Sequence, residues 1–213
     1  MPDASDILDA PPTRAALATA ARRRWTREEF ERATRLGLFR PEERLELIGG
    51  EVVRKMSPQE SRHATGISLA EEALRRAFPS GHVVRVQLPL ALGTHSEPEP
   101  DVCVVPGAIR DFEDDHPATA VLVVEVADTS LRDDRTVKAG LYAQAGIAEY
   151  WVVDLVGRAV DIHRDPVPMV DQPFGHHYRS VARHSEGATV SPLAAPEAAI
   201  PVAELLPTPR RGG

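Results

Sequence analysis

One segment constrains the fold of this 213-residue chain more than any other. Ala120–Val126 is a continuous apolar run, interrupted only by Glu125 and rich in β-branched valine. Apolar and polar positions do not alternate in it, so a strand formed here must be covered on both faces. A central strand of this kind is typical of a sheet flanked by helices. The run therefore predicts an α/β (α+β) domain with Glu125 inside its most buried strand.

The remaining segments supply the helices and strands that such a sheet needs. Thr26 followed by Glu29 is a capping box, which predicts a helix from Arg27, and Gly37 is well placed to end it. A hairpin is expected at 45–53, with its turn at Gly49–Gly50, and helices are expected at 62–78 and 134–146. Strands are expected at 101–105, 150–155 and 159–164, with weaker strands at 178–183 and 188–190. A further strand is expected at 84–92, where Pro89 indicates either an edge position or a bulge. The order predicts a mixed β-sheet core flanked by helices, with an N-terminal helix and β-hairpin.

The two ends of the chain are expected to be appendages of a single domain. Residues 1–24 are rich in Ala, Arg and Pro without periodicity, which predicts a flexible N-terminal arm. Residues 191–213 form a Pro-rich C-terminal tail with one short helical stretch expected near 202–206. Residues 25–190 remain as the folded domain, a length typical of one hydrophobic core.

Composition excludes several classes of protein. The single cysteine, Cys103, cannot form an internal disulfide or a Cys-based zinc site. No segment approaches the roughly 20 apolar residues of a membrane helix, and no secretory signal is visible, so a cytoplasmic protein is expected. The net charge of −7 is unlike that of a nonspecific nucleic-acid binder, although Arg22–Arg35 could supply a local basic face.

Three carboxylates interrupt or adjoin apolar strands: Glu46 in Leu-Glu-Leu-Ile, Asp101 before Val-Cys-Val-Val, and Glu125 in Val-Val-Glu-Val. A buried ionised carboxylate is costly unless it is paired or binds a metal. Grouped carboxylates raise one another's pKa, and a divalent cation between them relieves the repulsion. A salt bridge to arginine or a solvent-facing position is the alternative. That alternative is strongest for Glu46, which alternation would turn outward, and weakest for Glu125.

At these residues the sequence resembles a known superfamily. Pro100-Asp101, followed 24 residues later by Glu125, resembles the proline-aspartate … glutamate-x-lysine core of the PD-(D/E)XK, or restriction-endonuclease-like, nucleases. Four segments in order are similar to the Uma-two family within it: Leu-Glu-Leu-Ile-Gly-Gly-Glu at 45–51, Pro-Asp-Val-Cys-Val-Val at 100–105, Val-Val-Glu-Val-Ala-Asp-Thr-Ser at 123–130, and Ala-Gly-Ile-Ala-Glu-Tyr-Trp-Val-Val-Asp at 145–154. The resemblance covers roughly residues 25 to 190.

The resemblance implies a metal-dependent endonuclease that hydrolyses phosphodiester bonds of DNA. Asp101 and Glu125 would bind Mg²⁺ or Mn²⁺ at the ends of adjacent strands, with Glu46 as an outer or second-site acid. The metal polarises the scissile phosphate and lowers the pKa of the attacking water. A lysine two residues after the glutamate normally stabilises the developing charge. A homodimer is also expected, because nucleases of this type often cut duplexes as dimers.

The chain departs from the pattern at Ala127, which occupies the position of that lysine. The nearest lysine is Lys138 in the following helix, where Asp134, Lys138 and Tyr142 share one face. The family pattern also carries a lysine there, ahead of a tyrosine, so Lys138 is expected to take the displaced role. The alternative is an ordinary helix pair between Asp134 and Lys138.

Three residues are secondary candidates: Tyr142, on the helix face of Lys138, together with His63 and Gln87. His63 matches a family histidine position and could touch phosphate or the active-site water. Gln87 is expected on the same strand face as Arg85, where it could line the site or face solvent. Lys55, the only other lysine beside 23 arginines, has no role evident in the sequence. Two functions without catalysis stay open: an inactive module that binds nucleic acid or protein, which Ala127 favours, and a structural assembly protein.

Overall fold

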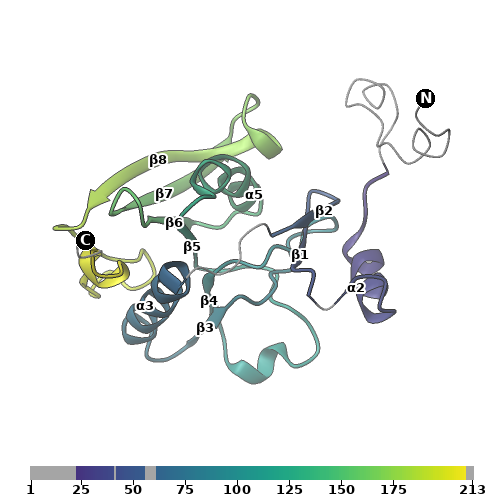
Figure 1. Ribbon diagram of the computed structural model, residues 1–213, viewed down its shortest axis with the longest axis horizontal. Coiled ribbons are helices and arrows are strands. Elements are labelled where there is room, and N and C mark those ends of the chain that lie inside the picture. The colour runs from purple at the N-terminus through teal and green to yellow at the C-terminus, as the bar shows by residue number, and fades with distance from the viewer. Residues whose placement is uncertain (1–22, 41, 56–60, 210–213) are drawn as a thin grey trace, which may run out of the picture.

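The computed structural model describes residues 23–40, 42–55 and 61–209. Residues 1–22 of the predicted N-terminal arm lie outside this range. The described part is built around a six-stranded mixed sheet in the order β3-β4-β5-β6-β7-β8, with helices on both of its faces (Figure 1). Its strands are β3 (His82–Val86), β4 (Val102–Pro106), β5 (Leu122–Ala127), β6 (Glu149–Asp154), β7 (Ala159–Pro168) and β8 (His176–Ser185).

The central strand is β5, as the apolar run predicts. Every residue of β5 is buried, because β4 pairs with it on one side and β6 on the other. The β5–β6 pair is parallel, whereas the other neighbouring pairs are antiparallel. A parallel pair needs a crossover connection. That connection carries α4 (Leu131–Asp133), the π-helical turn η2 (Asp134–Lys138) and α5 (Ala139–Gln144).

Three elements precede the sheet. The capping box of Thr26 and Glu29 is present at the start of α2 (Arg27–Arg35). The hairpin of β1 (Leu45–Ile48) and β2 (Glu51–Arg54) turns through Gly49 and Gly50, both with positive φ, as a two-residue turn of this type requires. Helix α3 (Ser61–Ala77) follows. In Figure 1, α2 lies beside the hairpin, away from the long strands of the sheet.

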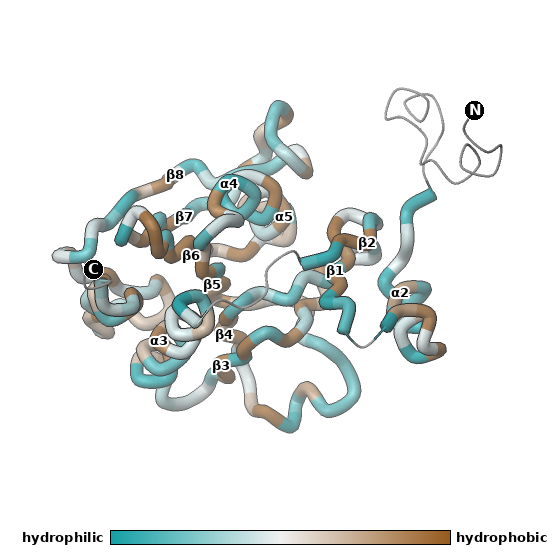
Figure 2. The backbone as a smooth tube through the Cα atoms, in the orientation of Figure 1, coloured by the Kyte–Doolittle hydropathy of each residue, from teal (hydrophilic) through white to brown (hydrophobic). Residues whose placement is uncertain are grey.

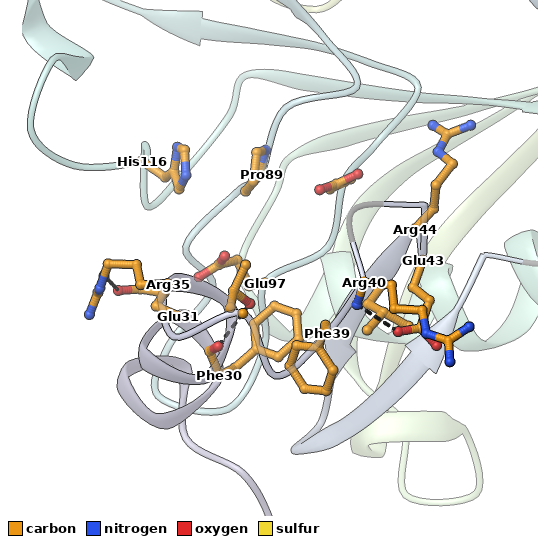
Figure 3. A pocket seen from close by; sticks show the side chains of 14 residues that line it. Phe30, Glu31, Arg35, Phe39, Arg40, Glu43, Arg44, Pro89, Glu97 and His116 are labelled. Atoms are coloured by element: carbon orange, nitrogen blue, oxygen red, sulfur yellow. Dashed lines mark hydrogen bonds and ion pairs between the residues drawn. The ribbon is translucent and has the colours of Figure 1, made fainter.

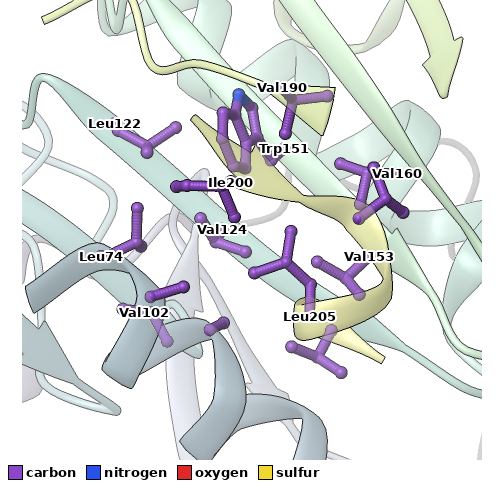
Figure 4. Close-up of a cluster of buried hydrophobic side chains, with 14 of the residues drawn as sticks. Leu74, Val102, Leu122, Val124, Trp151, Val153, Val160, Val190, Ile200 and Leu205 are labelled. Carbon is purple, nitrogen blue, oxygen red and sulfur yellow. The ribbon is translucent and has the colours of Figure 1, made fainter. Parts of the chain in front are cut away.

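Two hydrophobic clusters cover the two faces of the sheet. One lies under α3 and includes Leu74, Val124 and Trp151 (Figure 4). The other lies under α5 and includes Tyr142 and Tyr150. Figure 2 shows the hydrophobic residues concentrated along β4, β5 and β6, between these helices. The double coverage predicted from the central strand is therefore confirmed.

The Pro-rich C-terminal segment contributes to the first of these clusters. β10 (Ile200–Pro201) pairs with β9 (Thr189–Val190), and the 3₁₀ turn η4 (Val202–Leu205) follows. Ile200, Val202 and Leu205 are buried against the α3 face of the sheet. The segment is thus poor in regular structure but packed on the domain.

The strand expected at 84–92 is wrong in its length. β3 ends at Val86, and Gln87 has a φ of 49°, in the left-handed region that ends a strand. β3 is an edge strand, in agreement with the placement inferred from Pro89. The predicted helix at 134–146 also differs, because helical structure begins at Leu131 and passes through the π turn η2.

Candidate functional site

Three separate parts of the fold bring the three predicted carboxylates together. Glu46 lies in β1, Asp101 directly precedes β4, and Glu125 lies in β5. All three are buried, with exposed fractions of 4%, 2% and 2%, and all three line one cavity of about 570 Å³. The hairpin reaches this cavity because Glu97 and Leu47 exchange backbone hydrogen bonds, and the Glu99 amide donates to Glu46 Oε1 at 3.0 Å.

Asp101 is held by donors on both carboxylate oxygens. Its Oδ2 accepts from the Val126 amide at 2.9 Å and lies 3.3 Å from His63 Nε2. Its Oδ1 accepts from Lys55 Nζ at 3.2 Å. Burial alone would raise the pKa of Asp101, but the His63 hydrogen bond and the Lys55 ammonium outweigh it, so the pKa lies well below its usual range. Asp101 is therefore ionised at neutral pH.

Glu125 lies next to Asp101 and faces the crossover connection. Its Oε2 accepts from the Asp101 amide at 3.3 Å, and its Oε1 accepts from Lys138 Nζ at 2.9 Å and from the Tyr142 hydroxyl at 2.8 Å. Burial raises the pKa of Glu125, and the neighbouring Lys138 ammonium opposes that rise. Asp101 adds to the repulsion. Two carboxylates thus share one small, poorly solvated space.

The Lys138 ammonium lies between two of the three acids. It is 2.9 Å from Glu125 Oε1 and 3.2 Å from Glu46 Oε2. Burial disfavours its charge, but Glu125 and Glu46 more than compensate and raise its pKa above the usual value. Lys138 thus reaches out of η2 to the sheet, whereas Asp134 accepts from the Ser130 hydroxyl. The structure places Lys138 beside Glu125, as expected if it compensates for Ala127.

Lys55 also belongs to the site, and sequence reasoning missed it. The residue directly follows β2, and its ammonium is 3.2 Å from Asp101 Oδ1, 3.8 Å from Glu46 Oε1 and 3.0 Å from the Glu99 carbonyl oxygen. The signal was the composition. A chain with 23 arginines has two lysines, and the structure places both ammonium groups among the same carboxylates.

Of the three secondary candidates, His63 and Gln87 contact Asp101, and Tyr142 contacts Glu125. His63, in the first turn of α3, is hydrogen-bonded to the Asp101 carboxylate, which raises the pKa of His63. The Gln87 amide nitrogen lies 3.5 Å from Asp101 Oδ1. The reasoning for Gln87 was wrong, however, because β3 ends before it and its backbone turns at a positive φ. Gln87 therefore contacts Asp101 from the turn after β3, and not from a strand face that it shares with Arg85.

Asp133 and Asp134 add two further acids to the wall of the cavity. Burial, followed by repulsion from Glu125, raises the pKa of Asp134 to about 7. Its backbone carbonyl accepts from the Tyr150 hydroxyl at 3.1 Å, which ties η2 to the buried core. At neutral pH, Asp134 therefore carries only part of a negative charge.

The donor chemistry of the site fits a hard divalent cation. Asp101 and Glu125 offer carboxylate oxygens, which Mg²⁺ and Mn²⁺ prefer, and Mg²⁺ commonly binds through one or two carboxylates together with water and phosphate oxygens. Among the described residues, no three acidic, histidine or cysteine side chains form a ready-made ligand set. The ammonium groups of Lys55 and Lys138 instead provide positive charge next to the carboxylates.

Two adjacent histidines, the single cysteine and the N-terminal arginines lie away from this cavity. His176 and His177 begin β8, and His177 Nε2 lies 3.2 Å from the Arg135 carbonyl oxygen. Cys103 is fully buried in β4, and burial raises the pKa of its thiol to about 12. Arginines 23–35 do not line the cavity; Arg22 lies outside the described residues.

No helix in the described ranges has the length and hydrophobicity to cross a membrane.

Comparison with known proteins identifies the family and agrees with the fold. The family model Uma2, described as "Putative restriction endonuclease", matches residues 27–203. The fold is similar to the crystal structure of a nuclease of the DUF820 group from Anabaena variabilis, itself titled putative, with a TM-score of 0.62 and 17% sequence identity over 84% of this chain and 96% of that chain. No curated protein matches the sequence. The family model spans most of the chain, and the chain therefore belongs to the Uma2 family of putative restriction endonucleases.

Proposed function

We propose that this protein is a metal-dependent endonuclease that hydrolyses phosphodiester bonds of DNA. One observation carries the proposal: the Lys138 ammonium lies 2.9 Å from Glu125, whose carboxylate in turn accepts from the Asp101 amide. This places an aspartate, a glutamate and an ammonium side by side, the set of groups that supports phosphodiester hydrolysis. The ammonium comes from the crossover connection, 13 residues after Glu125, rather than from the strand itself.

Asp101 and Glu125 would hold Mg²⁺ or Mn²⁺, with Glu46 as an outer acid. The bound metal supplies a Lewis acid that polarises the phosphate and lowers the pKa of a water molecule. The remaining roles fall to the side chains around it. His63 and the Val126 amide fix the Asp101 carboxylate from one side, and the Tyr142 hydroxyl fixes Glu125. Both carboxylates are therefore oriented before any ligand arrives.

Lys138 is assigned the charge-stabilising role. Its pKa is raised, so it is an ammonium at neutral pH and suits negative charge that develops on the phosphate. A compact ammonium on a flexible stem can move between a carboxylate and a phosphate oxygen, which a planar guanidinium does less easily. Lys55 is placed to attract the phosphate through the same charge. Its side chain is 18% exposed and therefore reachable from the cavity.

Arginines at the mouth of the cavity provide contacts for the DNA backbone. Arg44 and Arg54 line it, and they flank Lys55 because the β1–β2 pairing places Arg54 opposite Leu45 and the Lys55 amide donates to the Arg44 carbonyl. Arginine guanidinium groups are well suited to phosphate oxygens. This local basic rim offsets the net charge of −7 at the place where the substrate would bind.

The test combines metal binding with cleavage. Calorimetry with Mn²⁺ is expected to give binding that Glu125→Ala abolishes, and supercoiled plasmid is expected to be nicked only when Mn²⁺ or Mg²⁺ is present. Lys138→Ala should bind the metal but lose nicking, and Lys138→Arg should not restore full activity. Glu72→Gln, an exposed change on α3, serves as the control. Absence of binding at millimolar metal would overturn the proposal, and full activity of Lys138→Ala would refute the role of Lys138.

A second function is favoured by a specific feature of the same site. Ala127 stands where the superfamily carries its lysine, and both lysine ammonium groups already form ion pairs with the carboxylates. An inactive module that binds nucleic acid or a protein partner is expected to lack the strand lysine and to keep its remaining lysines in structural ion pairs. It predicts that DNA binding persists in EDTA, that no metal binds, and that Glu125→Ala leaves DNA affinity unchanged.

A further inference from the structure

A second cavity lies on the other side of β1 from the carboxylate site. It has a volume of about 820 Å³, within the range of ligand pockets. Leu45 lines it, whereas the next residue, Glu46, lines the carboxylate cavity, because side chains alternate along a strand. Arg44 lines both cavities. A ligand that extends from one to the other would therefore pass this guanidinium.

One end of the second cavity is aromatic. Phe30 of α2 and Phe39 have ring centroids 5.7 Å apart, and Figure 3 shows Glu97 next to this pair. Phe30 is buried, whereas Phe39 is half-buried and keeps part of its surface accessible. Aromatic rings of this kind stack with nucleobases of any sequence. The aromatic end therefore fits a planar heterocycle.

Glu97 supplies a hydrogen-bond acceptor at that end. The residue is 6% exposed, its Oε2 atom accepts no hydrogen bond from a donor in the described ranges, and its carboxyl group lies within hydrogen-bond reach of the Glu31 carboxyl group. The nearest cation is Arg27, whose Nη1 is 3.8 Å away, beyond hydrogen-bond distance. A buried acceptor without a donor is costly. The burial of Glu97 and the neighbouring Glu31 carboxyl group raise its pKa to about 7.

Two arginines line the other end of the cavity, together with the acids Glu43 and Glu99. Arg40 and Arg44 line it and lie at the end away from Glu31 in Figure 3. In the part of the chain that the structure describes, neither guanidinium forms an ion pair or hydrogen bond, and Arg40 contacts Glu43 only through its backbone amide. Guanidinium groups that form no ion pair are suited to a phosphate, although the Glu99 carboxylate also attracts the guanidinium of Arg44.

We propose that this cavity binds one unstacked nucleotide of the substrate, with guanine as the preferred base. The base lies against Phe39 and presents its N–H edge to Glu97, and the phosphate contacts Arg40 and Arg44. Guanine offers two adjacent N–H donors on its Watson–Crick edge, which match the two oxygens of a carboxylate, whereas thymine has no exocyclic amino group. This inference rests on the proposed function, since it assumes a DNA strand across β1.

The test is a binding comparison that does not require cleavage. Fluorescence anisotropy with Ca²⁺ as the only divalent cation would compare a short oligothymidylate with the same strand carrying one central guanine or inosine. The guanine strand is expected to bind about tenfold more tightly, and inosine, which lacks the amino group, should lose most of that gain. Glu97→Gln should abolish the guanine preference, while Glu72→Gln keeps it. Arg40→Gln should weaken all three strands alike.

Three results would overturn the inference: equal affinity for the guanine and thymidine strands, no binding of any strand, or an unchanged guanine preference in Glu97→Gln. The inosine comparison uses the unmodified protein, so the test does not depend on the folding of a variant. A plasmid that stays intact with Mn²⁺, together with a guanine preference, would refute the nuclease and support the pocket. Metal-dependent nicking without a guanine preference would refute the pocket alone.

Discussion

Replacement of Lys138 by methionine tests whether its ammonium stabilises the fold by neutralising the buried carboxylates of Glu125 and Glu46. The ammonium is 2.9 Å from Glu125 and 3.2 Å from Glu46, and the three side chains are 13%, 3% and 5% exposed. Lys138→Met keeps the length and apolar stem of the side chain but leaves two buried carboxylates without their shared cation. Loss of one partner from a buried ion pair costs about 3–5 kcal/mol. For a domain of this size, that corresponds to a fall in melting temperature of roughly 6–20 °C.

The assay is urea or thermal unfolding followed by circular dichroism at pH 7, in EDTA and again in excess Mn²⁺. In EDTA the variant is expected to show the full loss. In Mn²⁺ the loss should shrink, because the metal ion restores positive charge beside Glu125. The double variant Lys138→Met/Glu125→Gln should lose less than the sum of the two single variants, because the two residues are in direct contact.

Two results would contradict this reasoning in different ways. A loss below about 1 kcal/mol in EDTA, the level of an exposed ion pair, would show that Lys138 does not neutralise buried charge. An equal loss in EDTA and in Mn²⁺ would leave the ion pair intact as an explanation but would refute the metal site. Lys138→Arg, which keeps the charge, is the matched control and should unfold closer to the unmodified protein.

Three further changes test other parts of the site. Tyr142→Phe removes the buried hydroxyl that donates to the carboxylate of β5 and should lower the free energy of urea unfolding by about 1.5–3 kcal/mol. Asp134 has a pKa raised to about 7 from 3.8, so it binds its proton more tightly in the folded state and lowers stability as pH rises through that window. The free energy of unfolding of Asp134→Asn, relative to that of the unmodified protein, should therefore rise between pH 4 and 7, by at most about 4 kcal/mol in urea titrations. A difference between the two proteins that does not change with pH would refute the raised pKa of Asp134. Gly140→Ala would place a Cβ against the Pro173 carbonyl oxygen, whereas Gly187→Ala meets open space, so only the former should lower the melting temperature.

The fold could be predicted because its strongest signals are local. The apolar run of β5 requires cover on both faces, and the capping box at Thr26 and the glycine pair at 49–50 each specify their own turn geometry. The end of β3 was not predictable in the same way. The alternation of apolar residues continues past Val86 to Leu92, but the chain turns at Gln87, whose amide donates to the Asp101 carbonyl. A contact across 14 residues thus overrides the local pattern.

The carboxylates could be identified from their apolar neighbours, but their mutual arrangement depends on long-range pairing. Asp101 and Glu125 become neighbours because β4 and β5 pair with Val102 opposite Val124. Glu46 joins them only when the hairpin pairs with Glu97. No periodicity in the sequence encodes that contact. The three carboxylates could therefore be named from the sequence, but their mutual geometry could not.

The two lysines illustrate the difference. Lys138 could be inferred because β5 and β6 are parallel neighbours, and the helix that connects such strands packs back over the sheet. A side chain there can reach a strand residue such as Glu125. Lys55 had no such argument, because its place depends on the docking of the hairpin. Composition nevertheless marked both, since an ammonium is small enough to lie between two carboxylates where the wider arginine fork does not fit as readily. In a chain that otherwise uses arginine, a lysine is therefore a reason to look for crowded acids, and here both lysines lie among them.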